Sequence, residues 1–284
     1  MIKIFLIIIN LGLGALTSIF SFSYAWYFHV LISLGFAIGY LLIEIIIFFI
    51  SAYLIGLPIK KDEIATKYSP KYRKIYDFYV SLALSLFGVY VVVNGLDKLP
   101  RDTNFVLVQN HLSNIDPMLS SVVFKNYPLI FISKESLFHI PFFGKYISRI
   151  GYIKLKRKAC KEDVSEMKRA HEWIQNNECS IALYPEGQRN KNYPNPKLLD
   201  FKDGGVGLAK SSHKPLVIST IQGTEKINDK LLLKIHKIQI DILDVISEDE
   251  IECLPAKEIN DRIINTMLSS IENKSSKDEY HHLF

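Results

Sequence analysis

Cysteine is scarce in this sequence, and glycine and proline are also few. The 284 residues include three cysteines, 14 glycines and 11 prolines. Cys160, Cys179 and Cys253 are odd in number and far apart, which excludes a disulfide framework and a Cys-x-x-Cys metal site. The low glycine and proline content excludes collagen-like and linker-dominated chains. The cysteine content therefore favours a reduced, cytoplasm-facing protein.

Charged residues are also few, at 22% of the chain against 49% hydrophobic residues. This balance excludes an intrinsically disordered chain and argues against a protein that faces water over its whole surface. The formal net charge of +5 is mildly basic and by itself favours no class of partner. The length suits one large domain or two modest ones.

Long hydrophobic segments are concentrated at the N-terminus. From Ile4 to Leu57 the sequence has Glu44 as its single Asp, Glu, Lys or Arg residue. A membrane-spanning helix needs about 20 apolar residues to cross a hydrocarbon core of about 30 Å. The stretch therefore predicts two antiparallel spanning helices, at residues 4–24 and 30–57, joined by a turn that is richer in polar and aromatic residues.

Two other interpretations apply to an apolar stretch of this kind. A cleaved signal peptide is disfavoured, because the apolar region continues into a second long segment and does not end at a small-residue cleavage site. One membrane pass followed by an interfacial segment remains open as an alternative topology. Glu44 is either a functional group at membrane depth or a protonated carboxyl that faces the other helix, and the lack of a charged partner in either segment favours the second.

A basic cluster follows the hydrophobic segments. Because cytoplasmic loops are enriched in Lys and Arg, this cluster places the chain after Leu57 in the cytoplasm, with Met1 on the same side. The cluster can also attract anionic lipid. The apolar run from Ile75 to Phe87 is too short to span comfortably and predicts an interfacial or docking helix. The basic residues are Lys60, Lys61, Lys67, Lys71, Arg73 and Lys74.

The remaining two thirds of the chain alternates predicted strands and helices, which indicates an α/β domain with a largely parallel sheet flanked by helices. Strands are expected at 89–93, 104–109, 129–133, 152–155, 180–184, 216–221 and 231–243, and helices from 117 onward and at 141–149, 161–176, 205–211 and 256–271. The predicted organisation is a transmembrane helical hairpin at 1–58, a basic segment with the short helix at 59–88, the α/β domain at 89–272 and a polar tail at 273–284.

The first loop that could carry chemistry runs from Asn110 to Pro117, between a predicted strand and a helix. On a regular helix His111 and Asp116 would point about 140° apart, but a loop that folds back could bring the imidazole to the carboxylate. The carboxylate would then orient the imidazole and leave its other nitrogen as a general base. The chain has no Gly-x-Ser-x-Gly motif, so the activated hydroxyl would belong to a substrate. The plain alternative is that Asp116 only caps the helix.

The second loop runs from Tyr184 to Lys191, directly after another predicted strand. Its proline and glycine define a turn, and Arg189 offers a guanidinium fork that suits a phosphate or a carboxylate. The alternative is a solvated turn in which Glu186 and Arg189 form an ion pair. Neither loop is specific when taken alone.

The order of several such blocks resembles the 1-acyl-sn-glycerol-3-phosphate acyltransferase family of the glycerolipid acyltransferases. NHLSNIDP at 110–117 is similar to the family's NHxxxxD block, GYIKLKR at 151–157 to GxIxIDR, and YPEGQR at 184–189 to FPEGTR. FKDG at 201–204 and KPLVI at 214–218 resemble the FKxG turn and the late VPIVP strand. The resemblance covers roughly residues 95–222.

This resemblance implies the glycerolipid acyltransferase fold and a catalytic dyad of His111 and Asp116. It also implies an enzyme that transfers a fatty acyl group from acyl-CoA or an acyl carrier protein to the sn-2 hydroxyl of lysophosphatidate, for phospholipid synthesis at the cell membrane. No metal or bound cofactor is expected. The implied substrate-binding residues are Arg157, Glu186, Gly187, Arg189 and Lys202.

Two positions depart from the family blocks, and they leave the acceptor open. Lys156 stands where the family has Asp, and Gln188 stands where it has Thr. The alternatives are another lysophospholipid or glycerol phosphate as acceptor, and a catalytically inactive membrane protein that binds lipid. Nucleic acid is not an expected partner, because the basic residues do not combine with aromatic residues in a recognised binding module.

Overall fold

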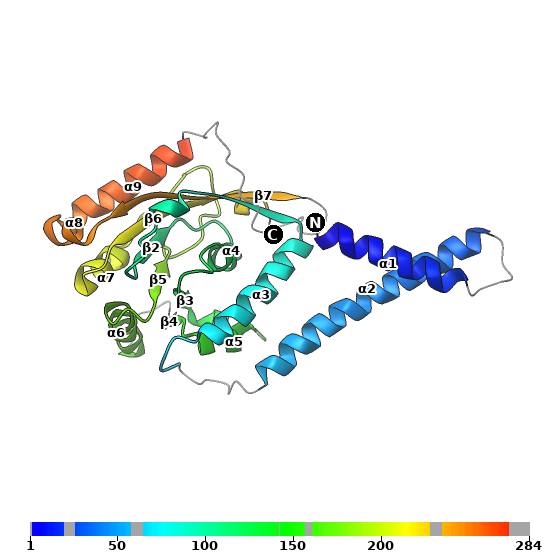
Figure 1. Ribbon diagram of the computed structural model, residues 1–284. Coiled ribbons are helices and arrows are strands. Elements are labelled where there is room, and N and C mark those ends of the chain that lie inside the picture. Colours follow the sequence, from blue (N-terminus) through cyan, green and yellow to red (C-terminus); the bar gives the residue numbers. More distant parts are fainter. Residues whose placement is uncertain are drawn as a thin grey trace. The chain divides into compact units, whose positions relative to one another are not determined.

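The computed structural model describes residues 2–19, 26–57, 65–141, 143–156, 161–227 and 235–272. It divides into an N-terminal unit that ends at Lys60 and a second unit from Lys61 to Leu283 (Figure 1). The expected turn near residues 20–25, the basic residues Lys60 and Lys61, the site residue Arg157 and the tail at 273–284 lie outside the described residues.

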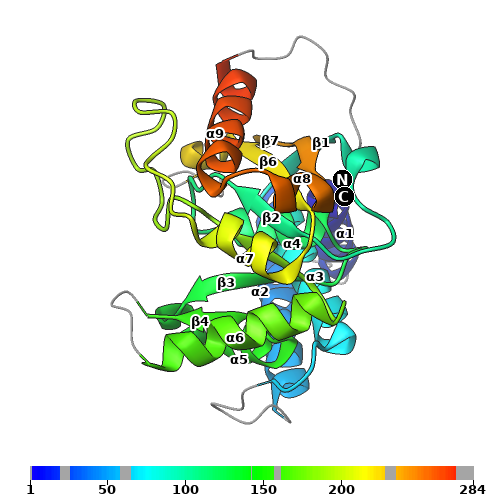
Figure 2. The same ribbon diagram turned by 90° about the vertical axis from the view of Figure 1, so that its left-hand side faces the viewer.

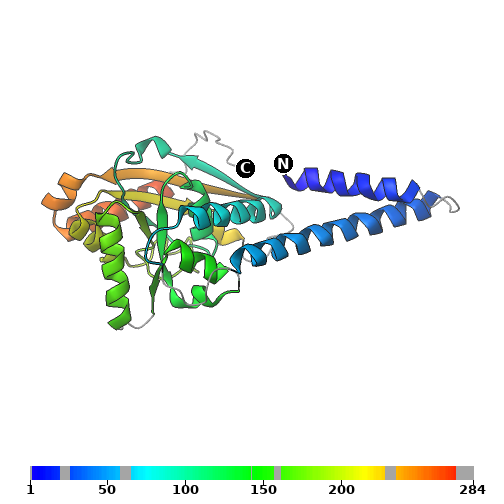
Figure 3. The same ribbon diagram turned by 60° about the horizontal axis from the view of Figure 1, so that its bottom comes forward.

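The N-terminal unit consists of α1 (Ile2–Ile19) and α2 (Trp26–Gly56), which lie alongside each other (Figure 3). The side-chain amide of Asn10 donates to the Glu44 carboxylate at 3.1 Å. A Cβ atom added to Gly14 would overlap the carbonyl oxygen of Ser33. The two helices thus meet through a small residue and a polar pair, as is common between helices in lipid.

Helix α2 contains one segment, Phe28–Gly56, that is long and apolar enough to cross a membrane by length and composition. Most of its large apolar side chains are exposed, among them Leu31 at 61% and Ile47 at 59%. An amphipathic core helix would bury one apolar stripe, and this segment does not.

The second unit begins with α3 (Pro70–Leu86), which has a proline at its first turn. Tyr76, Val80 and Leu84 repeat every fourth residue and are buried, and the helix contacts α4, α5 and β1. The short helix predicted from sequence is therefore present, and one face of it docks onto the α/β body.

The α/β body is built on one seven-stranded sheet with the order β1-β7-β6-β2-β5-β3-β4. Every neighbouring pair is parallel except β6 with β7. Val106 to Val108 are at most 1% exposed, as expected for strands covered on both faces. The prediction of an α/β fold with a mostly parallel sheet is confirmed. The strands are β1 (Val89–Asn94), β2 (Val106–Gln109), β3 (Leu129–Lys134), β4 (Ile153–Leu155), β5 (Ser180–Leu183), β6 (Leu216–Gln222) and β7 (His236–Ile246).

Helices cover both faces of the sheet. One layer holds α6, α7 and α9, which contact one another in sequence order, and the other holds α3, α4 and α5. Figure 1 shows these two layers on opposite sides of β2, β3 and β5, and Figure 2 shows the first layer in front. The helices not yet given bounds are α4 (Asp116–Val123), α5 (Phe143–Ile150), α6 (Lys161–Gln175), α7 (Gly204–Ser212), α8 (Glu248–Cys253) and α9 (Ala256–Glu272).

Candidate active site

Both loops singled out from the sequence follow adjacent parallel strands. Val106 of β2 pairs with Ile181 of β5, so the carboxyl ends of the two strands meet at the same edge of the sheet. The chain leaves β2 through α4 toward β3, and it leaves β5 through α7 toward β6, on the opposite side of the sheet order. The loops therefore open at a topological switch point, where α/β proteins bind ligands.

The first loop folds back so that His111 reaches Asp116. The Nδ1 atom of His111 lies 2.8 Å from Oδ2 of Asp116. The same oxygen accepts hydrogen bonds of 2.7 Å from the backbone N–H groups of Leu112 and Ser113. The Asp116 side chain is fully buried, whereas that of His111 is 17% exposed. With Nδ1–H donating to the carboxylate, Nε2 of the imidazole is left to accept a proton.

The expectation that Asp116 caps the helix is wrong. Helix α4 begins at Asp116 itself, with Ile115 before it and no side-chain cap. The carboxylate does not reach forward to the N–H groups of the helix, because it turns back to those of the preceding loop. Capping therefore does not explain the position of the carboxylate, which instead stabilises the loop that carries His111.

The second loop holds His111 from three sides. Oε1 of Glu186 accepts the backbone N–H of His111 at 2.8 Å. The backbone N–H of Asn190 donates to the His111 carbonyl oxygen, also at 2.8 Å. The Tyr184 ring stacks on the imidazole, with centroids 4.1 Å apart and an interplanar angle of 18°. The loop after β5 thus fixes the position of a residue that follows β2.

Glu186 is a buried brace. It is 3% exposed, and its second oxygen accepts the N–H of Leu199 at 3.1 Å. Burial raises the pKa of Glu186, and its two backbone N–H donors oppose that shift. The alternative of a solvated Glu186–Arg189 pair is wrong, because this carboxylate is buried and both of its oxygens bind backbone N–H groups. The two backbone contacts of Glu186 join the His111 loop to the segment at Leu199.

Two cations of the predicted site are open to a ligand. Arg189 is half-buried, and among the residues that the structure describes its guanidinium has no hydrogen-bond or ion-pair partner. Lys202 is exposed and lies against the turn at Gly187, which has φ +64°. A Cβ atom added to Gly187 would fall 2.7 Å from the Lys202 Nζ atom, so glycine at this position leaves room for the ammonium group.

The remaining positions from the sequence analysis lie outside these contacts or outside the described residues. Arg157 lies in a segment that the structure does not describe. Lys156 is exposed, and its ammonium pairs with Glu162 at 3.3 Å in the first turn of α6. Gln188 is exposed in the turn.

Two buried asparagines support the site and were not predicted from sequence. The Asn190 side chain is 1% exposed; it donates to the Pro196 carbonyl at 2.7 Å and accepts the Asn192 N–H at 3.2 Å. The Asn110 carboxamide pairs with both backbone groups of Ile221, at 2.8 and 3.0 Å. It thus extends the pairing of β2 with β6 by a side chain. The signal for Asn110 was its place directly after a buried strand, inside the first family block.

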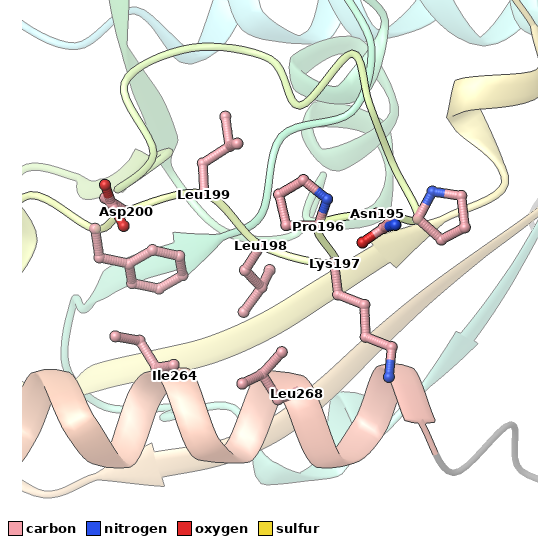
Figure 4. A pocket seen from close by; sticks show the side chains of 10 residues that line it. Asn195, Pro196, Lys197, Leu198, Leu199, Asp200, Ile264 and Leu268 are labelled. Atoms are coloured by element: carbon pink, nitrogen blue, oxygen red, sulfur yellow. The ribbon is translucent and has the colours of Figure 1, made fainter.

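A groove of about 600 Å³ lies between the segment 194–201 and α9. Leu198 points toward Ile264 and Leu268 of α9, whereas Leu199 points away from that helix (Figure 4). None of the seven predicted site residues lines it. Because Glu186 accepts the N–H groups of both Leu199 and His111, it connects the wall of the groove to the His111 loop. The lining residues are Pro194, Asn195, Pro196, Lys197, Leu198, Leu199, Asp200, Phe201, Ile264 and Leu268.

The comparison with protein families agrees with this arrangement. Residues 90–222 match the model of the family described as Acyltransferase. This part of the chain contains both loops and strands β2 to β6, and the match agrees with the similarity of the ordered sequence blocks to that family.

Individual relatives carry a more specific name. The chain is 33% identical over 181 residues to the chloroplastic 1-acyl-sn-glycerol-3-phosphate acyltransferase LPAT1 of Arabidopsis thaliana, which covers 62% of this chain and 49% of that protein. It is 26% identical over 196 residues to the 1-acyl-sn-glycerol-3-phosphate acyltransferase of Borreliella burgdorferi, with 66% and 76% covered. The chain thus spans about half the length of the plant relative.

A solved structure shares the fold. The crystal structure of the 1-acyl-sn-glycerophosphate acyltransferase PlsC from Thermotoga maritima matches with a TM-score of 0.58 and 24% identity, over 72% of this chain and 80% of that one. At this level of identity the match establishes the α/β architecture.

Proposed function

We propose that this protein transfers a fatty acyl group from an acyl thioester to the sn-2 hydroxyl of lysophosphatidate, which gives phosphatidate. The observation that carries the proposal is the 2.8 Å contact between His111 and the buried Asp116 at the switch point of the sheet. The names of the relatives support this choice of acceptor.

In this mechanism His111 is the general base. Its Nε2 atom takes the proton of the lipid hydroxyl while the oxygen attacks the thioester carbonyl, and a tetrahedral oxyanion forms. Collapse of this intermediate breaks the carbon–sulfur bond, and the imidazolium returns the proton to the departing thiolate. Asp116 orients the imidazole and stabilises the imidazolium. General-base assistance of this kind typically contributes about 10²–10⁴-fold to the rate.

Arg189 and Lys202 bind the acceptor phosphate in the proposed complex. No described residue pairs with the Arg189 guanidinium, whose fork suits a phosphate, and Lys202 lies beside the same turn because Gly187 leaves it room. Arg157 is proposed as a third phosphate ligand from the family resemblance alone. Binding of the phosphate orients the sn-2 hydroxyl toward His111. The hydroxyl and the base are then held in reactive geometry and need not meet by a random encounter. Glu186 contributes by holding the loops in place.

The N-terminal helices are the proposed membrane anchor. The exposed apolar side chains of α2 and its pairing with α1 through Asn10 and Glu44 favour a hairpin that spans the bilayer twice. We place the acyltransferase domain on the cytoplasmic side of the cell membrane, where acyl-CoA or acyl carrier protein is the donor. Because lysophosphatidate also partitions into the bilayer, an anchored enzyme meets it at high local concentration. No metal or bound cofactor takes part in the proposed reaction.

A panel of substrates tests the function. Full-length protein in vesicles is incubated with labelled acyl-CoA or acyl carrier protein and with lysophosphatidate, other lysophospholipids or glycerol 3-phosphate. We expect phosphatidate from lysophosphatidate, and a loss of at least about 100-fold in kcat for His111→Ala. The control is His171→Ala, because that imidazole lies on α6 and contacts Ser211 at 3.2 Å. If His111→Ala retains turnover, His111 is not the general base. If the wild-type protein acylates only another acceptor, lysophosphatidate is not the substrate.

A further inference from the structure

His111 is held through its main chain by two residues of the second loop. The carboxylate of Glu186 accepts its backbone N–H at 2.8 Å, and the backbone N–H of Asn190 donates to its carbonyl oxygen, also at 2.8 Å. Arg189 directly precedes Asn190 in the sequence. The backbone of the proposed phosphate ligand is therefore one residue away from a hydrogen bond to the backbone of the proposed base.

Asn190 is the buried residue of this turn. It is 1% exposed, whereas Arg189 before it is half-buried and Lys191 after it is exposed. Its side-chain amide donates to the Pro196 carbonyl oxygen at 2.7 Å, and its side-chain oxygen accepts the Asn192 N–H at 3.2 Å. Because these contacts are made in addition to the backbone N–H contact, Asn190 cannot shift without leaving a buried polar group unpaired, which is unfavourable.

The segment that contains Pro196 is itself supported by α9. The ammonium of Lys197 pairs with Glu272 of that helix at 2.6 Å, and the Leu198 side chain points toward the same helix (Figure 4). The carbonyl group that Asn190 binds therefore belongs to a segment that contacts the body of the domain on both sides of its own chain. Asn190 connects the turn after the phosphate ligand to this supported segment.

We propose that Asn190 is a positioning residue that sets the spacing between Arg189 and His111 and thereby determines which hydroxyl of the acceptor is acylated. This inference rests on the proposed function and extends it. In lysophosphatidate the phosphate is on the sn-3 carbon, so an sn-2 hydroxyl is on the adjacent carbon and an sn-1 hydroxyl is one carbon further away. A fixed spacing between phosphate ligand and base brings the first hydroxyl into reactive geometry and leaves the second outside it.

Two ether lipids test this role in the full-length protein in vesicles, with the acyl donor that supports turnover. 1-O-hexadecyl-glycerol 3-phosphate has a free sn-2 hydroxyl, whereas 2-O-hexadecyl-glycerol 3-phosphate has a free sn-1 hydroxyl, and an ether chain does not migrate between the two positions. Because a misplacement of about 1 Å can cost about 10²-fold in rate, we expect the wild-type kcat/KM to favour the first lipid by at least about 100-fold. For Asn190→Ala we expect this ratio to fall at least about tenfold, since the spacing is no longer fixed.

The ratio separates positioning from a merely structural role. A variant that is partly unfolded loses activity toward both lipids in the same proportion, and its ratio stays at the wild-type value. Asn192→Ala is the matched control, because Asn192 is exposed and its side chain makes no hydrogen bond within the described ranges, while the substitution keeps the backbone N–H that Asn190 accepts. We expect wild-type kcat/KM values for this variant. The inference is overturned if Asn190→Ala keeps the wild-type ratio, or if Asn192→Ala changes the ratio as much.

Amide hydrogen exchange of the wild-type protein covers the case in which Asn190→Ala does not fold. Because the Asn190 N–H is bound to the His111 carbonyl, we expect it to exchange at least about 100-fold more slowly than the N–H of the exposed Lys191. Equal exchange rates would show that the two loops are not held together, and would overturn the inference.

Failure of the proposed function gives a different result. A wild-type protein that acylates neither the ether lipids nor lysophosphatidate refutes the function and this inference together. An active wild type whose ratio is unaffected by Asn190→Ala refutes only the role of Asn190.

Discussion

Single side chains around His111 divide into those that hold it and those that are open to a ligand. Glu186 and Asn190 bind its backbone, and Asp116 and Tyr184 contact its ring. Asp116, Glu186 and Asn190 are buried, whereas Arg189 is half-buried. This division separates two kinds of mutational effect, one on the reacting imidazole and one on the binding of the acceptor.

Arg189→Ala tests the binding side of this division. We expect the KM for lysophosphatidate to rise about 10- to 100-fold, since hydrogen bonds to charged groups contribute about 1.5–3 kcal/mol, while the KM for the acyl donor stays nearly constant. Steady-state kinetics with each substrate varied in turn give both values. Arg101→Ala is the control, because Arg101 is exposed and precedes β2, at the opposite end of that strand from His111. A rise in donor KM instead would assign Arg189 to the donor site.

At this scale the sequence predicts contacts within one loop better than contacts between loops. The His111–Asp116 approach could be anticipated, because both residues lie in one short segment whose reversal needs only a turn. The burial of Glu186 could not, because its partners are the backbone N–H groups of His111 and Leu199. Backbone groups of a distant segment leave no mark in side-chain type or spacing.

In helix α3 the structure gives Arg73 a role that its sequence context does not suggest. In the sequence Arg73 belongs to a basic cluster that suggests a membrane-facing surface, yet in the structure it is 2% exposed. It binds both oxygens of Asp77 at 2.9 Å, the carbonyl of Ser121 at 2.6 Å and the carbonyl of Leu129. Arg73 therefore ties α3 to α4 and β3, and the expectation that it attracts anionic lipid along with the rest of the basic cluster is wrong for this residue.

Arg73→Met tests this tie. We expect a loss of about 3–5 kcal/mol in the free energy of unfolding, because the change leaves the buried Asp77 carboxylate without its cation. Burial already raises the pKa of Asp77 even with Arg73 and Ser121 opposing the shift. Denaturant unfolding followed by tryptophan fluorescence measures the loss. Lys74→Met, at an exposed neighbouring position, should change stability by no more than about 0.5 kcal/mol. Equal effects of the two variants would contradict the tie.

Elements that carry their own periodicity were predictable, and elements defined by partners were not. Helix α9 buries Ile259, Ile263 and Met267 at every fourth position, so its buried face can be predicted from its sequence. Helix α8 has six residues, which is too short for a periodic pattern, and its start is stabilised by the capping box of Ser247 with Glu250. The antiparallel pairing of β7 with β6 places β7 between β6 and β1, and local sequence does not encode that choice of neighbours.

The whole molecule combines an apolar N-terminal unit with a more polar α/β unit. Helix α2 exposes large apolar side chains such as Leu31 and Ile47, and a contiguous apolar surface of this kind is unfavourable in water but not in lipid. The proposed reaction needs the same arrangement, because both the acyl chain and the lyso-lipid acceptor are membrane molecules. Topology matters for the proposed function, because the proposed acyl thioester donor is cytoplasmic.

Cysteine labelling tests the proposed topology. Cys253 of α8 is exposed, whereas Cys179 is buried, and burial raises the pKa of the Cys179 thiol so that little reactive thiolate forms. In a Cys160→Ser variant, Cys253 is therefore the expected target of a membrane-impermeant maleimide. We expect no labelling of intact bacterial cells that express this variant, and full labelling of inverted vesicles made from them. Additional replacement of Cys253 by Ser should abolish the signal in vesicles. Labelling of intact cells at Cys253 would place the acyltransferase domain outside and separate it from the cytoplasmic acyl thioester that the proposed reaction needs.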